Sequence, residues 1–82
     1  MMKVHVRLFA AARQAAENDS IELIVPADAT VSDVKTALLE ALPALSPLGE
    51  QLRFAVNADY ASSSTQIGPT DEVACIPPVS GG

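Results

Sequence analysis

The chain has 82 residues, of which 49% are hydrophobic and 18% are charged, a composition typical of one small folded domain. Five basic side chains against ten acidic ones give a net charge of −5. This charge argues against a nucleic-acid partner, because nucleic-acid-binding proteins need a clustered basic surface. The single Cys excludes an internal disulfide, and the single His excludes most metal clusters, so no metal site is expected.

The sparse use of Cys fits a reducing compartment, and we expect a soluble, cytoplasmic protein. No apolar run approaches the roughly 20 residues that a membrane span needs, so no membrane partner is expected. The first seven residues alternate between polar and apolar side chains, whereas a signal peptide has a continuous apolar stretch.

The first predicted element is a strand over residues 3–9, because polar and apolar side chains alternate there. An Ala-rich stretch at residues 10–17 predicts a short helical turn, and residues 21–25 alternate again and predict a second strand. If the apolar side chains of the first strand face the core, the others face away from it; these are His5, Arg7 and Phe9.

A helix is predicted from Val31, because Thr30 can cap its first N–H groups and Asp33 lies near the positive end of the helix dipole. Apolar residues then recur at spacings of three and four until Pro43 stops the helix. Residues 45–49 are expected to form a loop.

Three further strands are predicted at residues 52–56, 60–61 and 72–76. Turn residues precede the last strand at 68–71, and the polar segment 62–66 is expected to be a solvated loop. One main helix and one sheet predict a two-layer α+β domain, in which the helix covers one face of the sheet.

A nucleophilic pair formed by His5 and Cys75 is the first candidate for chemistry within the domain. The alternation of side chains along their strands predicts that the two lie on opposite sides of the sheet. We therefore interpret Cys75 as a small buried hydrophobe and His5 as a surface residue. No Gly-rich phosphate loop or metal-ligand spacing is present, so the domain is expected to contain no catalytic site of its own.

The C-terminus carries the stronger signal. Pro77 and Pro78 favour an extended path, and the chain ends in Gly81 and Gly82. A stiff spacer with a tip that lacks side chains can enter a narrow channel and present its terminal carboxylate. A carboxylate is a poor electrophile, so such a tip needs activation by another protein, for example by adenylation.

The sequence resembles the small, sulfur-carrying subunit of molybdopterin synthase, a family with the ubiquitin-like β-grasp fold. The resemblance extends over essentially the whole chain and includes Phe9-Ala10 followed by Arg13. It is most specific in Phe54-Ala55-Val56-Asn57 and in the ending Asp71-Glu72-Val73-Ala74-Cys75-Ile76-Pro77-Pro78-Val79-Ser80-Gly81-Gly82. The resemblance implies a mixed sheet of about five strands on one main helix, with a domain at residues 1–76 and an extended, flexible tail at residues 77–82.

The resemblance also implies a reaction at the tail. A ubiquitin-activating-like enzyme would use ATP to adenylate the carboxylate of Gly82, and sulfur would replace AMP to give a thiocarboxylate. The tail would then enter the large synthase subunit, in an assembly of two small and two large subunits, and donate sulfur to cyclic pyranopterin monophosphate. In this scheme the chain binds no cofactor, Gly81 provides access, and the large subunit supplies the catalytic groups.

A docking surface is expected beside the tail. Phe9 and Ile76 are predicted on the sheet face away from the helix, and Tyr60 can join them if its short strand lies along the same edge. With the tail residues before the terminal glycines, they form the predicted partner-binding set: Phe9, Tyr60, Ile76, Pro77, Pro78, Val79 and Ser80.

Three alternatives remain open from the sequence. A sulfur carrier for thiamine or cysteine biosynthesis would share the fold and the Gly-Gly end, although the Pro-Pro-Val-Ser lead-in favours the molybdopterin branch. A ubiquitin-like tag would be joined through Gly82 to lysines of other proteins, and a plain interaction module would have an inert tail.

Overall fold

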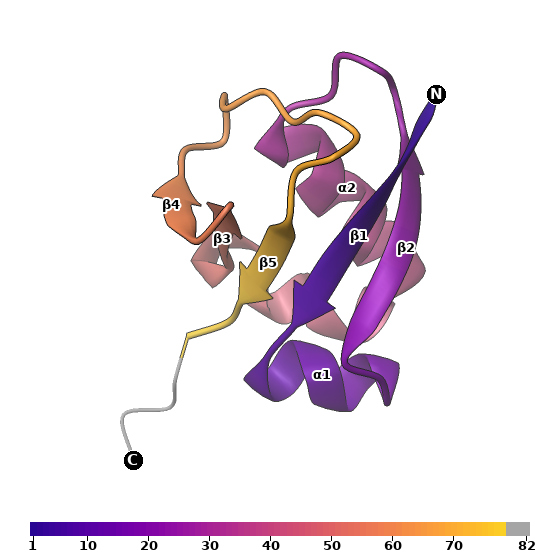
Figure 1. Cartoon of the computed structure of the whole chain (residues 1–82). Coiled ribbons are helices and arrows are strands. Elements are labelled where there is room, and N and C mark those ends of the chain that lie inside the picture. Colours follow the sequence, from indigo (N-terminus) through magenta and orange to yellow (C-terminus); the bar gives the residue numbers. More distant parts are fainter. Residues whose placement is uncertain (79–82) are drawn as a thin grey trace.

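The computed structural model describes residues 1–78, which form a five-stranded sheet with helices packed on one of its faces (Figure 1). The strands are β1 (Met2–Leu8), β2 (Ser20–Val25), β3 (Arg53–Val56), β4 (Asp59–Ala61) and β5 (Val73–Ile76). The helices are α1 (Ala10–Ala16), α2 (Val31–Ala41) and the 3-10 helix η1 (Pro43–Gln51). The predicted α+β class, with about five strands on one main helix, is confirmed.

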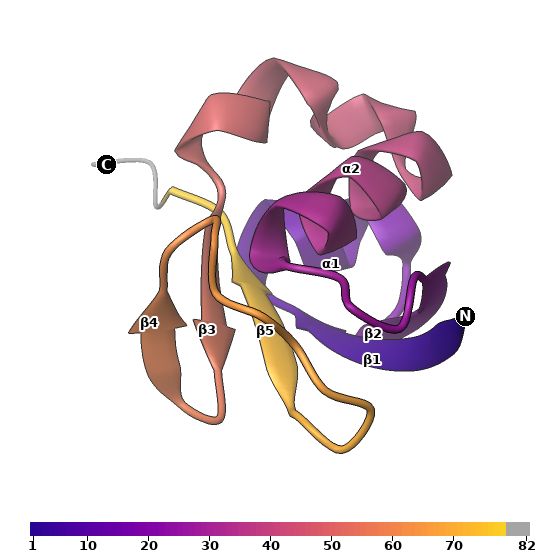
Figure 2. The same cartoon turned by 90° about the horizontal axis from the view of Figure 1, so that it is seen from above.

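The strand order is β2-β1-β5-β3-β4, so the first and last strands lie side by side in the middle of the sheet. The β1–β5 pair is parallel and the other pairs are antiparallel, which makes the sheet mixed. Figure 2 shows α1, α2 and η1 together on one side of the sheet, whereas no element of residues 1–78 covers the other face. We call this second side the open face.

The core lies between the sheet and α2. The alternate residues Val4, Val6 and Leu8 of β1 are almost completely buried, as are Val34 and Leu38 of α2. Burial of such aliphatic side chains is the main stabilising contribution in a small domain. The predicted inward face of the first strand is therefore confirmed, and its alternate residues point to the open face.

The predicted loop at residues 45–49 is wrong, because this segment belongs to η1. Pro43 ends α2 as expected but is well suited to the first turn of the next helix, where its missing N–H has no partner to lose. Leu45 and Gly49 of η1 are buried, so contacts with the core hold the segment in place.

The predicted solvated loop at residues 62–66 is confirmed, because four of its five residues are exposed, and its backbone is in addition hydrogen-bonded to the start of α2. The backbone N–H of Val31 donates to the carbonyl of Thr65 at 2.9 Å, and that of Ser32 donates to the carbonyl of Ser63 at 2.9 Å. The first N–H groups of a helix have no partner within the helix, and here carbonyl oxygens of the loop accept hydrogen bonds from two of them. The segment is thus tied to the start of α2, and Ile67 directly after it is buried.

The ends of several strands differ from the prediction by one residue. β1 ends at Leu8 because Phe9 becomes the N-cap of α1. β5 begins at Val73, since the backbone N–H of Glu72 donates to the side-chain oxygen of Asn57 and not to a neighbouring strand. Among the helices of residues 1–78, none has the length and hydrophobicity that a bilayer span requires.

Candidate functional site

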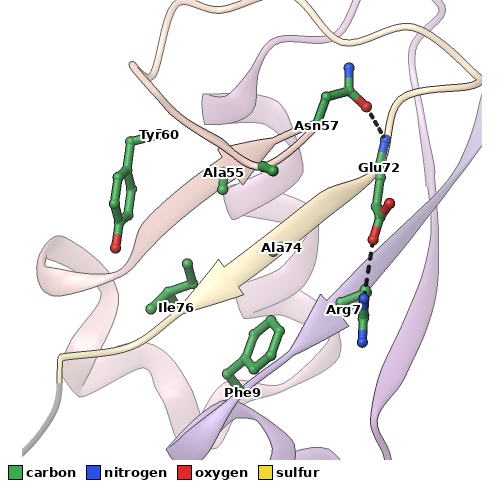
Figure 3. Close-up of a pocket in the computed structure, with 9 residues that line it drawn as sticks. Arg7, Phe9, Ala55, Asn57, Tyr60, Glu72, Ala74 and Ile76 are labelled. Atoms are coloured by element: carbon green, nitrogen blue, oxygen red, sulfur yellow. Dashed lines mark hydrogen bonds and ion pairs between the residues drawn. The ribbon is translucent and has the colours of Figure 1, made fainter.

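An open hollow of about 560 Å³ lies on the open face of the sheet, and we call it the sheet hollow. The predicted surface residues Phe9, Tyr60 and Ile76 all line it, so the structure brings them together (Figure 3). Ala55 and Ala74 line it between them, and their small side chains leave space that larger ones would fill. The remaining lining residues are Arg7, Asn57, Ala58 and Glu72.

The parallel β1–β5 pair places Phe9 near Ile76. Leu8 lies opposite Cys75 in this pair, so the next residue of each strand reaches the open face at the same level. Phe9 keeps an extended backbone with φ −126° and ψ 155°, although it has left the strand ladder. Two segments that are far apart in the sequence thus form one apolar surface.

Tyr60 reaches the same surface from the edge of the sheet. It lies on β4 opposite Ala55 of β3, and its side chain is 71% exposed. Phe9 is also exposed, at 42%. Large apolar side chains gathered around one hollow are typical of a protein-binding surface, so the geometry supports the predicted docking role of these residues.

A polar network borders the sheet hollow at its far end. The guanidinium of Arg7 pairs with the carboxylate of Glu72 at 3.2 Å and lies 5.8 Å from the centroid of the Phe9 ring. This distance is within cation–π range, so Arg7 links the acidic residue to the aromatic one. Figure 3 shows this pair beside the hollow.

Asn57 fixes the loop that leads into β5. Its backbone N–H donates to the carbonyl of Glu72 at 2.8 Å, and its side-chain oxygen accepts from the N–H of Glu72 at 3.0 Å. Its side-chain amide donates to Asp71 at 3.0 Å. Asn57 therefore holds Glu72 in the position from which it reaches Arg7.

Asp71 is stabilised in its charged form. Its carboxylate accepts from the backbone N–H of Gly68 at 2.7 Å and from the amide of Asn57. These two hydrogen bonds hold the pKa of Asp71 below the ordinary value of an Asp carboxyl, and the bond from Gly68 has the larger effect.

The sequence analysis placed Asn57 in the family-specific stretch Phe54-Ala55-Val56-Asn57 but did not detect this network. One signal was present: Asn tolerates the positive φ of 53° observed here better than most residues. Its side-chain bonds to residues 14 and 15 positions away depend on the fold.

The predicted separation of His5 and Cys75 is confirmed. His5 is exposed on the open face, where its Nε2 lies 3.4 Å from the carboxylate of Glu22. Cys75 is fully buried on the opposite side, and burial raises the pKa of its thiol to about 11. Because the thiolate is the nucleophile, this thiol is poorly suited to chemistry at neutral pH.

The tail leaves the sheet beside the sheet hollow. Pro77 is buried, which shows that the packed body continues to this residue, and Pro78 is exposed. A second hollow of about 580 Å³ lies at this point. Its lining residues come from the end of η1, from β3 and β4, and from the end of β5 with the two prolines: Glu50, Gln51, Arg53, Tyr60, Ile76, Pro77 and Pro78. We call it the tail hollow. The predicted site residues Val79, Ser80, Gly81 and Gly82 lie outside the described residues.

This strand order, with helices on one face of a mixed sheet and a hollow with large apolar side chains on the open face, defines a small ubiquitin-like domain. Residues 6–82 match the model of the ThiS family. The chain belongs to this family, and the resemblance inferred from its sequence is confirmed.

Two relatives named molybdopterin synthase sulfur carrier subunit are similar over nearly their whole length. The one from Mycobacterium tuberculosis is 36% identical, with all of both chains covered. The one from Arabidopsis thaliana is 31% identical, with 99% of this chain and 84% of the relative covered.

Solved structures show the same fold. The crystal structure of SAMP1, small archaeal modifier protein 1, from Haloferax volcanii is 33% identical with a TM-score of 0.84, and 98% of this chain and 99% of that chain are covered. The putative molybdopterin converting factor subunit 1 from Pyrococcus furiosus is 29% identical with a TM-score of 0.83, covering 96% and 100%. A chain of the complex of subunits 1 and 2 of molybdopterin-converting factor from Helicobacter pylori is 23% identical, with a TM-score of 0.66. The match covers 99% of this chain and 100% of that chain and shows a similarity of fold alone.

Proposed function

We propose that this chain is the sulfur carrier subunit of a molybdopterin synthase and acts in the cytoplasm. The observation that carries the proposal is the 36% identity, over the full length of both chains, to a relative that bears this name. The geometry supports it, because an apolar hollow suited to a protein partner lies directly beside the root of a tail that ends in Gly-Gly.

The proposed reaction takes place at Gly82. A ubiquitin-activating-like adenylyltransferase joins the terminal carboxylate to AMP and releases pyrophosphate from ATP. A sulfur donor then displaces AMP, which leaves a thiocarboxylate on the carrier. The nucleotide is a substrate of the activating enzyme and is bound to the carrier only as a transient glycyl-adenylate.

Sulfur transfer then occurs in the large synthase subunit. The sheet hollow docks on that subunit through Phe9, Tyr60 and Ile76, and the tail residues before Gly82 provide reach. The thiocarboxylate sulfur bonds to cyclic pyranopterin monophosphate, and water then cleaves the bond between this sulfur and the Gly82 carbonyl carbon, so the sulfur stays on the pterin and the carrier leaves with an ordinary carboxylate. Two such deliveries build the dithiolene of molybdopterin, in an assembly of two small and two large subunits whose catalytic groups belong to the large one.

A second candidate function is protein modification through the same terminus. It is favoured by the similarity to the small archaeal modifier protein of Haloferax volcanii, at 33% identity and a TM-score of 0.84. In that case the activated Gly82 would form an isopeptide bond with a lysine of another protein.

Intact-mass analysis of the chain isolated from its native cells tests both functions. A carrier shows the mass change of one oxygen-to-sulfur exchange at its terminus, whereas a modifier appears in conjugates with other proteins. Reconstitution with candidate large subunits then asks which one converts the cyclic pterin precursor. A chain with neither modification, and no activity with any large subunit, would overturn the proposal.

A further inference from the structure

The five cations of the chain differ in how they are neutralised. Lys3 pairs with Glu22 at 3.6 Å, Arg7 with Glu72 at 3.2 Å and Arg13 with Asp19 at 3.8 Å. The other two cations are Arg53 and Lys35, and neither forms an ion pair with a side chain of residues 1–78.

The two cations without an ion pair line the same hollow at one corner of the molecule. Arg53 lines the tail hollow and also a third hollow of about 290 Å³, which Lys35 of α2 lines as well. Tyr60 lines both of these hollows and the sheet hollow, so the corner is continuous with the predicted docking surface. We call Arg53 and Lys35, with the two hollows between them, the basic corner.

Arg53 also lies next to the root of the tail. It is opposite Ile76 in the β3–β5 pair, and residues directly opposite each other in a sheet point to the same face. Its side chain is therefore on the open face, one residue before Pro77. A protein that receives the tail passes this position before it reaches the terminal glycines.

The local charge is opposite to that of the whole chain. Among residues 1–78, Glu50 is the single carboxylate that lines the two hollows, against two cations, whereas the whole chain has a net charge of −5. A partner with a basic surface would be attracted to the chain in general and repelled at this corner. A partner with an acidic group at this corner would be held in one orientation, with its channel in line with the tail.

We propose that the basic corner binds an acidic segment of the protein that receives the tail, at the mouth of its channel. The paired charges around the sheet hollow need no such partner, because each already has a counter-ion within the chain. Arg53 makes the main contact, because its planar guanidinium suits a carboxylate and it stands beside the tail root. This inference rests on the proposed function, since it assumes that a partner receives the tail.

The test compares charge reversals at two arginines in the full-length chain. Arg53→Glu is measured against Arg13→Glu, which makes the same change in net charge on α1, away from the three hollows. Binding to the large synthase subunit is measured by calorimetry at several salt concentrations, and sulfur delivery is measured with the thiocarboxylate form of each variant.

We expect Arg53→Glu to weaken binding by about tenfold or more at low salt, because a repulsive contact replaces an attractive one. The difference should shrink as salt rises, since screening acts on exposed charges. Arg13→Glu should change binding by about twofold or less, and Lys35→Glu should fall between the two. Arg53→Lys should lose less affinity than Arg53→Glu but not bind as tightly as the unaltered chain, because lysine keeps the charge without the planar guanidinium. Replacing the contacting acidic residue of the large subunit by lysine should restore binding of Arg53→Glu.

Equal effects of Arg53→Glu and Arg13→Glu, or tighter binding by Arg53→Glu, would overturn the inference. If Arg53→Glu fails to fold because of repulsion from Glu50, Arg53→Ala provides the same comparison without a new carboxylate. If the unaltered chain binds and delivers sulfur and neither Arg53 variant loses binding, the proposed role of the basic corner is rejected and the proposed function stands. An unaltered chain that neither binds nor delivers sulfur rejects the proposed function, and this inference with it.

Discussion

Cys75 shows how its environment decides what a residue can do. Its thiol is the single one in the chain, but it points into the core and its pKa is raised to about 11 by burial. We expect Cys75→Ala to keep full sulfur delivery and to lower the free energy of unfolding by about 1–2 kcal/mol, the cost of a small cavity. Denaturant unfolding and a reconstituted delivery assay check this. A folded variant without delivery would show that the thiol takes part.

The raised pKa of Cys75 also predicts that the free energy of unfolding depends on pH. Its folded pKa is about 11, above the ordinary value of 9.0, so the folded state retains its proton where the unfolded state has lost it. The unfolding free energy should therefore fall as the pH rises from 9 to 11. Cys75→Ala should decline less over this range, and identical slopes for the two proteins would contradict the assignment.

Asn57 joins two loops through three hydrogen bonds to Asp71 and Glu72. We expect Asn57→Gly to lower the free energy of unfolding by about 1–2 kcal/mol, because the side-chain bonds are lost while a positive φ remains easy. Asn57→Ala should cost more, since alanine is strained at φ 53°. Chemical unfolding of the three proteins separates the two effects, and equal stability of both variants would mean that strain contributes little.

At the scale of elements, the parallel β1–β5 pair brings together the residues of the proposed docking surface. Phe9 and Ile76 follow paired residues of these strands and line one hollow. We expect the double variant Phe9→Asp with Ile76→Asp to stay folded and to lose most of its affinity for the large subunit, because two charges replace apolar contacts. Binding measurements and thermal melting check both parts.

Ile24 offers a matched control for this variant. It is also a large apolar residue, 58% exposed, but it lies on β2 and does not line the sheet hollow. Ile24→Asp should leave binding nearly unchanged. Unfolding of the double variant would show that these side chains support the core, and an equal loss with Ile24→Asp would argue for a nonspecific charge effect.

At the scale of the whole molecule, the proposed function requires the length of the tail to set the distance between the docked domain and the reacting atom. Deletion of Gly82 leaves a similar carboxylate on Gly81 but withdraws it by roughly 3.3 Å, the length of one extended residue. A misplacement of about 1 Å can cost 10²-fold in rate, so we expect sulfur delivery to be abolished. Gly81→Val should fail as well, because a β-branched side chain restricts the backbone and adds bulk.

Both tail variants should melt like the unaltered chain and keep much of their binding through Phe9 and Ile76. A defined mixture of purified components measures molybdopterin formation, melting and binding together. Normal product formation by the shortened chain would refute the assignment of Gly82 as the carrier residue.

The sequence by itself determined the class of the fold and the inward faces of its strands. Alternation marked Val4, Val6 and Leu8 as core residues, and the spacing of Val34 and Leu38 marked the buried side of α2. These signals are local, since side-chain direction repeats every two residues in a strand and every three or four in a helix. The terminal Gly-Gly is likewise a local feature of the sequence, and its role as the carrier tip stays a prediction.

Tertiary structure decided the features that depend on contacts between distant segments. Residues 45–49 are helical and bury Leu45 in the core, and the exposed loop at residues 62–66 is tied to α2 because the first N–H groups of that helix donate to its carbonyls. The side-chain hydrogen bonds of Asn57 and the hollow that Arg53 and Lys35 both line likewise arise only when strands pair and α2 packs on the sheet. Local propensity contains no information about which segments become neighbours. The packing of side chains and the pairing of hydrogen-bond donors with acceptors both depend on those neighbours.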